Sequence, residues 1–216
     1  MKLYSYFRSS ASYRVRIALN LKGLSADIIP VNLVKSEQKD AAYTAKNPQG
    51  LVPSLEIDST TGSMVLAQSL AIIEYLDELD SSVPLLPSDR DGRAIVRSLS
   101  QLIACEIHPL NNLRVLKYLT GELGVDEATK NAWYAHWIHE GFRALEAELN
   151  KHAGQFCYGD TPTMADCCLV PQVFNAKRFE VDLSAYPTIN RIVTNCQSLD
   201  AFIQAAPANQ PDAPSA

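Results

Sequence analysis

The sequence lacks an excess of basic residues. Of its 216 residues, 19 are Lys or Arg and 24 are Asp or Glu, which gives a formal net charge of -5. Nucleic-acid-binding proteins usually carry a basic face, so we expect no nucleic-acid partner. No apolar run approaches the roughly 20 residues of a membrane-spanning helix, and the first seven residues lack the long apolar region of a secretory signal. We therefore expect a cytoplasmic protein with no membrane partner.

Cysteine is scarce, and its spacing is not that of a disulfide framework. The five cysteines are odd in number and form no Cys-x-x-Cys pair, so we expect reduced thiols. Cys167 and Cys168 are adjacent within an apolar stretch, which favours a place in the core. His136 and His139 have helical i, i+3 spacing, but the solvated face of an amphipathic helix explains them better than a zinc pair. We expect no metal site.

An α/β pattern fills the first part of the chain. Residues 2–7 predict a strand, residues 12–22 a helix with Gly23 at its C-terminal cap, and residues 26–31 a second strand. A strand, a helix and a strand at this spacing form a βαβ unit. Such crossovers are right-handed, and their strands are parallel.

The pattern continues with a short helix and a hairpin. A polar helix is expected around residues 38–45, ended by the turn at residues 47–50. Residues 54–57 and 64–66 predict an antiparallel hairpin, and residues 69–79 predict a further helix. The order βαβ–α–ββα resembles the thioredoxin-like fold.

Strand patterns stop after a stretch rich in Ser, Pro and Asp. Helices are predicted at residues 93–119, 127–149, 163–176 and 187–199, followed by an extended tail at 205–216 that is rich in Pro and Ala. We therefore predict an α/β thioredoxin-like N-terminal domain at residues 1–80, a linker at 81–88 and an all-α C-terminal domain at 89–216.

Thr163 and Asp166 have the spacing of a capping box. Thr163 can accept a hydrogen bond from the first turn of the helix, and Asp166 can reach back to the cap residue. This structural role, worth about 1 kcal/mol, is preferred to a role for Asp166 as an acid catalyst.

Hydroxyl groups gather between the first strand and the first helix, at residues 9–12. A helix N-terminus offers free N–H groups and a partial positive charge that stabilise an anion, and a serine there can donate to a thiolate. Serine is also a favoured N-cap. Position alone leaves the cap and the anion site equally good explanations. Arg14 and Arg16 lie on the helix body and are interpreted as structural.

Pro53 follows Leu51-Val52 at the start of a predicted strand. Because only about 5% of X–Pro bonds are cis, the sequence alone favours a trans bond. A cis bond would expose the backbone N–H and C=O of Val52 to an extended peptide ligand.

Gln68 and Ser69 open the helix at residues 69–79. Ser69 is a good N-cap. The same position can hold a carboxylate through its hydroxyl and the free backbone N–H groups.

These motifs resemble those of one family. Residues 4–19 are similar to the zeta-class glutathione transferase signature Ser-Ser-Cys-Ser-x-Arg-Val-Arg-Ile-Ala-Leu, with Ala11 where the family has cysteine. The similarity covers nearly the whole chain, including residues 47–48, 52–53, 68–76, 159–173, 178–183 and 186–189. It implies the glutathione transferase fold, a cis bond at Pro53, glutathione as cofactor and a homodimer.

The resemblance also assigns roles. It implies that Ser9 and Ser10 bind the glutathione sulfur and are the catalytic residues. Further glutathione contacts are implied at Gln38, Val52, Gln68, Ser69, His108 and Asn112, the last two facing the same cleft from the helical domain. Because the attacking sulfur belongs to glutathione, Ala11 leaves a serine-based mechanism intact but puts in doubt any activity that needs a protein thiol there.

The activity that the family implies is isomerisation of maleylacetoacetate to fumarylacetoacetate, a step of aromatic amino-acid (tyrosine) catabolism. The glutathione thiolate adds to the cis double bond, the resulting single bond rotates, and elimination leaves the trans product. Because arginine binds carboxylates through paired hydrogen bonds, Arg8, Arg114 and Arg178 are proposed substrate clamps, although a surface role explains each equally well.

Other functions stay open. Maleylpyruvate is an alternative small diacid substrate. A general glutathione transferase or dehalogenase would consume glutathione, whereas an isomerase would not. A non-catalytic interaction protein with this fold would lack glutathione binding, and the intact serine, Val52-Pro53 and Gln68-Ser69 motifs argue against it.

Overall fold

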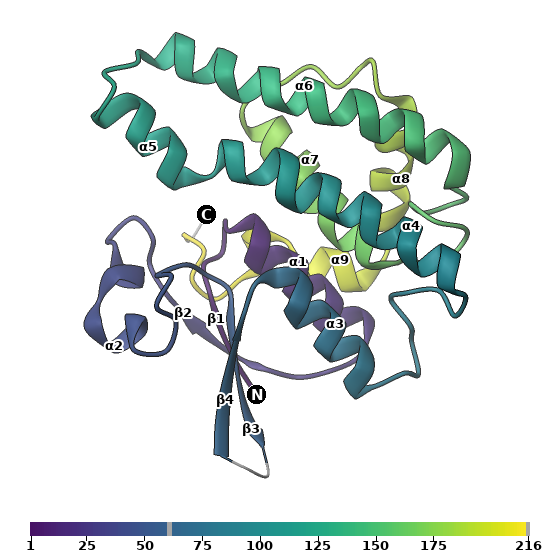
Figure 1. The fold of residues 1–216 in the computed structure, drawn as a ribbon, viewed down its shortest axis with the longest axis horizontal. Helices are drawn as coiled ribbons and strands as arrows, with labels where there is room; N and C mark the ends of the chain where they lie inside the picture. Colours follow the sequence, from purple (N-terminus) through teal and green to yellow (C-terminus); the bar gives the residue numbers. More distant parts are fainter. Residues whose placement is uncertain (60–61, 215–216) are drawn as a thin grey trace. The chain divides into compact units, whose positions relative to one another are not determined.

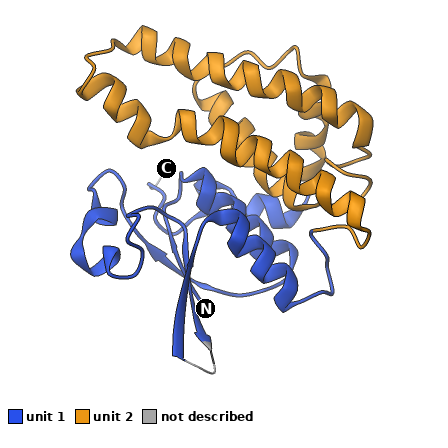
Figure 2. Cartoon of the chain, in the orientation of Figure 1, with its two compact units in different colours: residues 1–85, 197–216 blue, residues 86–196 orange. Residues whose placement is uncertain are grey.

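The computed structural model describes residues 1–59 and 62–214. It divides into two compact units, Met1–Leu85 with Gln197–Ala216, and Leu86–Cys196 (Figure 2). The boundary between the units falls within the predicted linker, but the segment from Gln197 onward packs with the first unit. No helix in the described part of the chain is long and apolar enough to cross a bilayer.

A mixed sheet organises the first unit. Its strands are β1 (Lys2–Ser5), β2 (Asp27–Pro30), β3 (Ser54–Ser59) and β4 (Gly62–Ala67). They lie in the order β2-β1-β3-β4, with β1 and β2 parallel and β3 antiparallel to both of its neighbours. The predicted βαβ unit and hairpin are therefore confirmed.

Helices cover both faces of this sheet. They are α1 (Ser10–Leu21), α2 (Ala41–Thr44), α3 (Ser69–Leu79) and α9 (Asp200–Ala205), with 3-10 turns η1 (Glu37–Lys39) and η4 (Pro207–Asn209). Figure 1 shows α1 and α3 on one side of the sheet and α2 on the other. Because side chains alternate along a strand, Tyr4 packs on Tyr43 of α2 with ring centroids 5.8 Å apart, while Leu3 is fully buried on the opposite face.

Two predictions in this unit are wrong. The helix expected at residues 38–45 is a 3-10 turn followed by one α-helical turn, because Asp40 between them has an extended backbone (φ -63, ψ 145). The tail expected to be extended contains η4. Two of its residues, Ala205 and Asp212, accept hydrogen bonds from Arg16 and Phe7, so the tail packs against the first unit.

The second unit is helical, apart from an isolated β-bridge between Ala153 and Gly159. Its elements are α4 (Arg90–Gln101), the π-helix η2 (Leu102–Ile107), the 3-10 helix η3 (His108–Asn111), α5 (Leu113–Gly121), α6 (Glu127–His152), α7 (Met164–Arg178) and α8 (Pro187–Gln197). An α/β unit followed by a helical one is the fold class that the sequence predicted.

The single helix predicted at residues 93–119 is wrong, because the chain breaks between α4 and α5. Pro109 has no N–H to donate, so a helical hydrogen bond is missing there, and the backbone turns extended at Asn112 (φ -67, ψ 147). Asn112 then begins α5 as its N-cap, and its side-chain oxygen accepts from the Arg114 N–H at 3.1 Å. The break places polar side chains at the junction of two helices.

The predicted capping box is confirmed at the start of α7. Thr163 Oγ1 accepts from the Ala165 N–H, and Asp166 Oδ2 accepts from the Thr163 N–H at 2.8 Å. Asp166 is fully buried, and its other oxygen accepts from the Cys157 N–H at 2.9 Å. Cys167 is also buried, as is Cys168, and all five cysteines are free thiols.

Candidate active site

The N-terminus of α1 carries the serine pair. Ser9 is the N-cap, and its Oγ accepts from the Ser12 N–H at 3.2 Å. Because a hydroxyl that accepts one hydrogen bond can still donate its own hydrogen, capping leaves Ser9 able to donate to a thiolate. Ser10 is the first helical residue and is buried. The N-terminus of α1 can therefore be capped by Ser9 and still bind an anion.

Arg8 precedes the serines and is exposed. Its Nη2 donates to Tyr6 Oη at 3.2 Å, and its guanidinium carbon lies 5.1 Å from the centroid of the Phe7 ring. The guanidinium thus stacks beside the loop that carries the serines, with solvent access for an anionic ligand.

The Val52–Pro53 peptide bond is cis. The resemblance predicted this correctly, whereas the base rate for X–Pro bonds favoured trans. The turn before it is anchored at the Leu51 carbonyl, which accepts from Tyr43 Oη at 2.6 Å and from Asn47 Nδ2 at 2.8 Å. This anchoring fixes the backbone of Val52, the group expected to pair with an extended peptide.

Gln38 lies close to the same turn. A Cβ added to Gly50 would lie 2.9 Å from the Gln38 carbonyl oxygen, so the glycine permits the close approach of these two segments. The side-chain oxygen Oε1 of Gln38 is buried and has no hydrogen-bond partner among the described residues. A ligand donor at this position would satisfy it.

The N-terminus of α3 has a backbone conformation that suits anion binding. Gln68 has φ 72 and ψ 113, a left-handed conformation that is strained for a residue with a side chain. Its amide donates to Gln49 Oε1 at 2.8 Å rather than capping the helix. The first N–H groups of α3 are therefore not capped by the Gln68 side chain, which suits a bound carboxylate.

A buried arginine on α1 donates a hydrogen bond to the side chain of Ser69. Arg14 Nη1 on α1 donates to Ser69 Oγ at 3.2 Å, and Arg14 is only 2% exposed. Arg14 was interpreted as structural from its place on the helix body, and the contact with Ser69 is an intramolecular one that the sequence did not reveal.

The remaining predicted residues lie in the second unit. His108 begins η3, and its Nε2 lies 3.4 Å from Asn112 Nδ2. Arg114 is exposed two residues later on α5. His108 and Asn112 therefore lie between α4 and α5, and Arg114 lies in the first turn of α5.

Arg178 ends α7, with its guanidinium carbon 4.7 Å from the centroid of the Phe179 ring. That ring stacks on Tyr134 of α6 at 3.8 Å. The carbonyl of Tyr134 in turn accepts from Asn111 Nδ2 of η3 at 3.1 Å. Tyr134 on α6 thus contacts both the C-terminal end of α7, which carries Arg178, and η3, which begins at His108.

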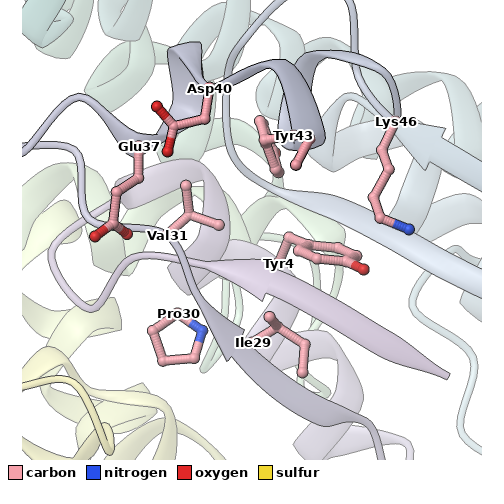
Figure 3. Close-up of a pocket in the computed structure, with 9 residues that line it drawn as sticks. Tyr4, Ile29, Pro30, Val31, Glu37, Asp40, Tyr43 and Lys46 are labelled. Atoms are coloured by element: carbon pink, nitrogen blue, oxygen red, sulfur yellow. The ribbon is translucent and has the colours of Figure 1, made fainter.

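A separate pocket lies on the α2 side of the sheet (Figure 3). Its volume is about 230 Å³, and it is lined by Tyr4, Ile29, Pro30, Val31, Glu37, Asp40, Ala42, Tyr43 and Lys46. None of these is a predicted site residue. Tyr4 Oη and Lys46 Nζ both donate to Glu56, at 2.7 and 2.8 Å, so two of its polar groups are already used within the fold.

A thioredoxin-like unit joined to a helical unit is the architecture of the glutathione transferases. The chain belongs to the glutathione S-transferase family: the model of the N-terminal domain matches residues 8–79, and that of the C-terminal domain matches residues 127–207. It is thus a member of an enzyme family.

Its relatives place it in the zeta class. A solved structure described as the holo form of maleyl pyruvate isomerase, a bacterial zeta-class glutathione S-transferase, is 51% identical, with a TM-score of 0.94 over 99% of this chain and 100% of that chain. The maleylacetoacetate isomerase of Anaeromyxobacter dehalogenans, solved with bound glutathione, is 43% identical, with a TM-score of 0.90 over 99% and 97%. A probable maleylacetoacetate isomerase of Vibrio cholerae is 51% identical over 98% of this chain and 97% of its own length.

Proposed function

We propose that the protein is a glutathione-dependent cis–trans isomerase that converts maleylacetoacetate to fumarylacetoacetate. One observation carries the proposal: a single compact unit contains the serine-capped start of α1, the cis turn at Val52 and the uncapped start of α3. Together they match the three parts of glutathione, which are a thiol, a central peptide and a γ-glutamyl carboxylate.

The residues fit the cofactor. Glutathione, when bound, would supply the thiolate nucleophile for reversible addition to the cis double bond of the substrate. Ser9 and Ser10 hydrogen-bond the sulfur, and the α1 N-terminus favours its negative charge. Val52 pairs through its backbone with the cysteinyl group. Gln68 and Ser69 hold the γ-glutamyl carboxylate.

Three further residues are proposed glutathione contacts. Gln38 has the buried side-chain oxygen that needs a donor. His108 and Asn112 share the break between α4 and α5. The domain assignment is part of the same proposal: residues 1–80 bind glutathione, residues 81–88 link, and the helical domain begins at residue 89, with the segment from Gln197 onward packing with the first unit.

Arg8, Arg114 and Arg178 are the proposed ligands of the substrate carboxylates. All three are exposed, and guanidinium groups bind carboxylates through two parallel hydrogen bonds.

Maleylpyruvate is the second candidate substrate, favoured by the 51% identical zeta-class structure described above. The identity to the Vibrio cholerae relative is also 51%, so similarity does not separate the two diacids. Initial rates on both substrates, measured with the same protein preparation, separate them directly.

We further propose a cytosolic homodimer that acts in tyrosine catabolism, on the strength of the family resemblance. Light scattering is expected to give twice the chain mass of 23.8 kDa. A mass equal to one chain would contradict the dimer.

The decisive experiment follows fumaryl product formation from maleylacetoacetate with and without glutathione. We expect conversion that requires glutathione and leaves its concentration unchanged. Consumption of glutathione would instead indicate a transferase or dehalogenase, and failure to bind it in calorimetry would indicate an interaction protein. Binding without conversion would exclude maleylacetoacetate and leave maleylpyruvate to be tried.

Alanine variants then assign the activating hydroxyl. Ser9→Ala removes the N-cap as well as a hydroxyl, so it is expected to lower the free energy of unfolding by about 1 kcal/mol. Ser10→Ala removes a hydroxyl without removing the cap. Urea denaturation beside the activity assay therefore separates loss of the thiolate donor from loss of helix stability.

A further inference from the structure

The C-terminal segment reaches the loop that carries the serine pair. Asp212 Oδ2 accepts from the Phe7 N–H at 2.9 Å, across 205 positions of sequence. Phe7 lies between β1 and α1, two residues before Ser9. A carboxylate from the end of the chain therefore holds the backbone immediately before the α1 N-cap.

Arg16 holds the other side of the same residue. Its Nη2 donates to the Phe7 carbonyl at 2.9 Å, and its Nε donates to the Ala205 carbonyl at 3.0 Å. Arg16 is only 3% exposed, and burial lowers its pKa to about 10, so it stays charged at neutral pH. The guanidinium thus connects the loop to the C-terminal segment from within α1.

The two contacts form a clamp on Phe7, which we define as Asp212 on the N–H and Arg16 on the carbonyl. The second carboxylate oxygen of Asp212 is buried and has no hydrogen-bond partner among the described residues. Burying a carboxylate is unfavourable unless charge and hydrogen bonds compensate. The Phe7 N–H bound to Oδ2 and the nearby positive charge of Arg16 are the interactions that offset this cost.

We propose that Asp212 is a positioning residue that, with Arg16, fixes the peptide groups of Phe7 and thereby the placement of the Ser9 and Ser10 hydroxyls toward the glutathione sulfur. This inference rests on the proposed function. It assigns a role in the chemistry to a C-terminal residue that lies outside the serine motif and outside the proposed glutathione contacts.

The test compares Asp212→Ala, Asp212→Asn and the matched control Gln210→Ala. Asparagine keeps an oxygen that can accept from the Phe7 N–H, whereas alanine keeps none. Gln210 Nε2 donates to the Gln204 and Ala206 carbonyls within the C-terminal segment, so its loss perturbs the segment without touching the clamp.

The first readout is amide hydrogen exchange at Phe7 in the protein without glutathione. Asp212→Ala is expected to speed this exchange roughly tenfold or more, because a hydrogen bond to a charged acceptor is lost. Asp212→Asn is expected to retain most of the protection, and Gln210→Ala is expected to match the wild type. Unchanged exchange in Asp212→Ala would overturn the clamp itself.

The second readout is the ultraviolet absorbance of the glutathione thiolate, titrated against pH in the complex, together with kcat and KM. For Asp212→Ala we expect a higher thiol pKa and a kcat roughly tenfold lower, with KM for glutathione little changed because the other proposed glutathione contacts lie outside the loop that carries the serines. A general loss of stability would lower the melting temperature without moving the thiol pKa, and that result would overturn the positioning role.

The two proposals fail in different ways. A wild-type protein that converts neither maleyl substrate refutes the isomerase, while the exchange and thiolate measurements still test the clamp. An active wild type whose Asp212→Ala variant has normal kcat and normal thiol pKa refutes the positioning role alone.

Discussion

Arg14 illustrates how one buried residue can serve a site on a different element. It belongs to α1, yet its Nη1 donates to Ser69 Oγ at the start of α3, at 3.2 Å. A fixed positive charge there adds to the partial charge of the helix N-terminus, and both favour a carboxylate. The buried guanidinium therefore orients the Ser69 hydroxyl and strengthens the field at this helix end.

Replacing Arg14 with Met, which keeps the length of the side chain, is expected to weaken glutathione binding about tenfold, the usual effect of losing a hydrogen bond to a charged group. Isothermal titration calorimetry measures this dissociation constant directly. The exposed Arg90 provides a control, since Arg90→Met removes the same charge from a surface site. Equal affinities for Arg14→Met and the wild type would show that Ser69 needs no support from Arg14.

Glu56 offers a second test at the residue scale, through pH. Hydrogen bonds from Lys46 and Tyr4 hold the pKa of Glu56 near 2, well below its ordinary value of 4.5. Because the folded-state pKa is lowered, the ionised carboxylate stabilises the protein above about pH 4.5, and this contribution is lost as the pH falls toward 2.

The expected result is a stability difference between wild type and Glu56→Gln that is constant near neutrality and shrinks between pH 4.5 and 2. Urea denaturation at a series of pH values measures it. Comparison with the variant is essential, because hydrogen bonds to Ser82 and Thr129 also lower the pKa of Asp80 and Asp126. A difference that stays constant down to pH 2 would contradict the coupling to Lys46 and Tyr4.

At the scale of elements, α6 approaches the π-helix η2 through a glycine. A Cβ added to Gly141 would lie 2.2 Å from Ile107 Cγ1, well inside van der Waals contact. Alanine in place of glycine favours a helix by up to about 1 kcal/mol, but overpacking a core costs about 1–3 kcal/mol. The severity of this overlap makes the packing cost the larger effect.

Gly141→Ala is therefore expected to lower the free energy of unfolding by about 1–2 kcal/mol. Gly121→Ala, on α5, is the matched control: no atom lies within 4 Å of its added Cβ, so it is expected to be neutral or slightly stabilising. Because Ile107 precedes His108, Gly141→Ala is also expected to weaken glutathione binding. A stabilised Gly141→Ala variant would show that Ile107 moves aside without cost.

Elements made by local patterns were predictable from the sequence, and those made by distant contacts were not. The helix Ser69–Leu79 and the capping box depend on neighbours within a few residues, and both were predicted correctly. The break at Pro109 was visible as a proline, but hydrophobic periodicity on both sides of it favoured one continuous helix. The cis bond at Pro53 contradicts its base rate, so only the family resemblance predicted it.

The site shows the same limit. Its motifs lie next to helix starts and turns, where sequence patterns are informative. The contact between Phe7 and Asp212 joins residues 205 positions apart, and a short tail rich in Pro and Ala contains no periodicity that would reveal it. The bond from Arg14 to Ser69 depends on how α1 packs beside α3, which the sequence of either helix does not specify.

At the scale of the whole molecule, the proposal that His108 and Asn112 contact glutathione has a direct consequence. Both lie in the second unit, whereas Val52, Gln68 and Ser69 lie in the first. A ligand that binds only the folded state stabilises whatever it contacts, by about 2.7 kcal/mol at one hundred times its dissociation constant. Glutathione should therefore slow hydrogen exchange in both units.

The measurement is hydrogen exchange by mass spectrometry with and without saturating glutathione. We expect increased protection around residues 52–53 and 68–72 and also around residues 108–114, because local opening of each segment would break a ligand contact. Asn112→Ala should abolish the protection at 108–114 and leave that at 52–53 in place. Protection confined to the first unit would remove His108 and Asn112 from the glutathione site and leave Arg114 and Arg178 as the second unit's proposed contribution, through the substrate carboxylates.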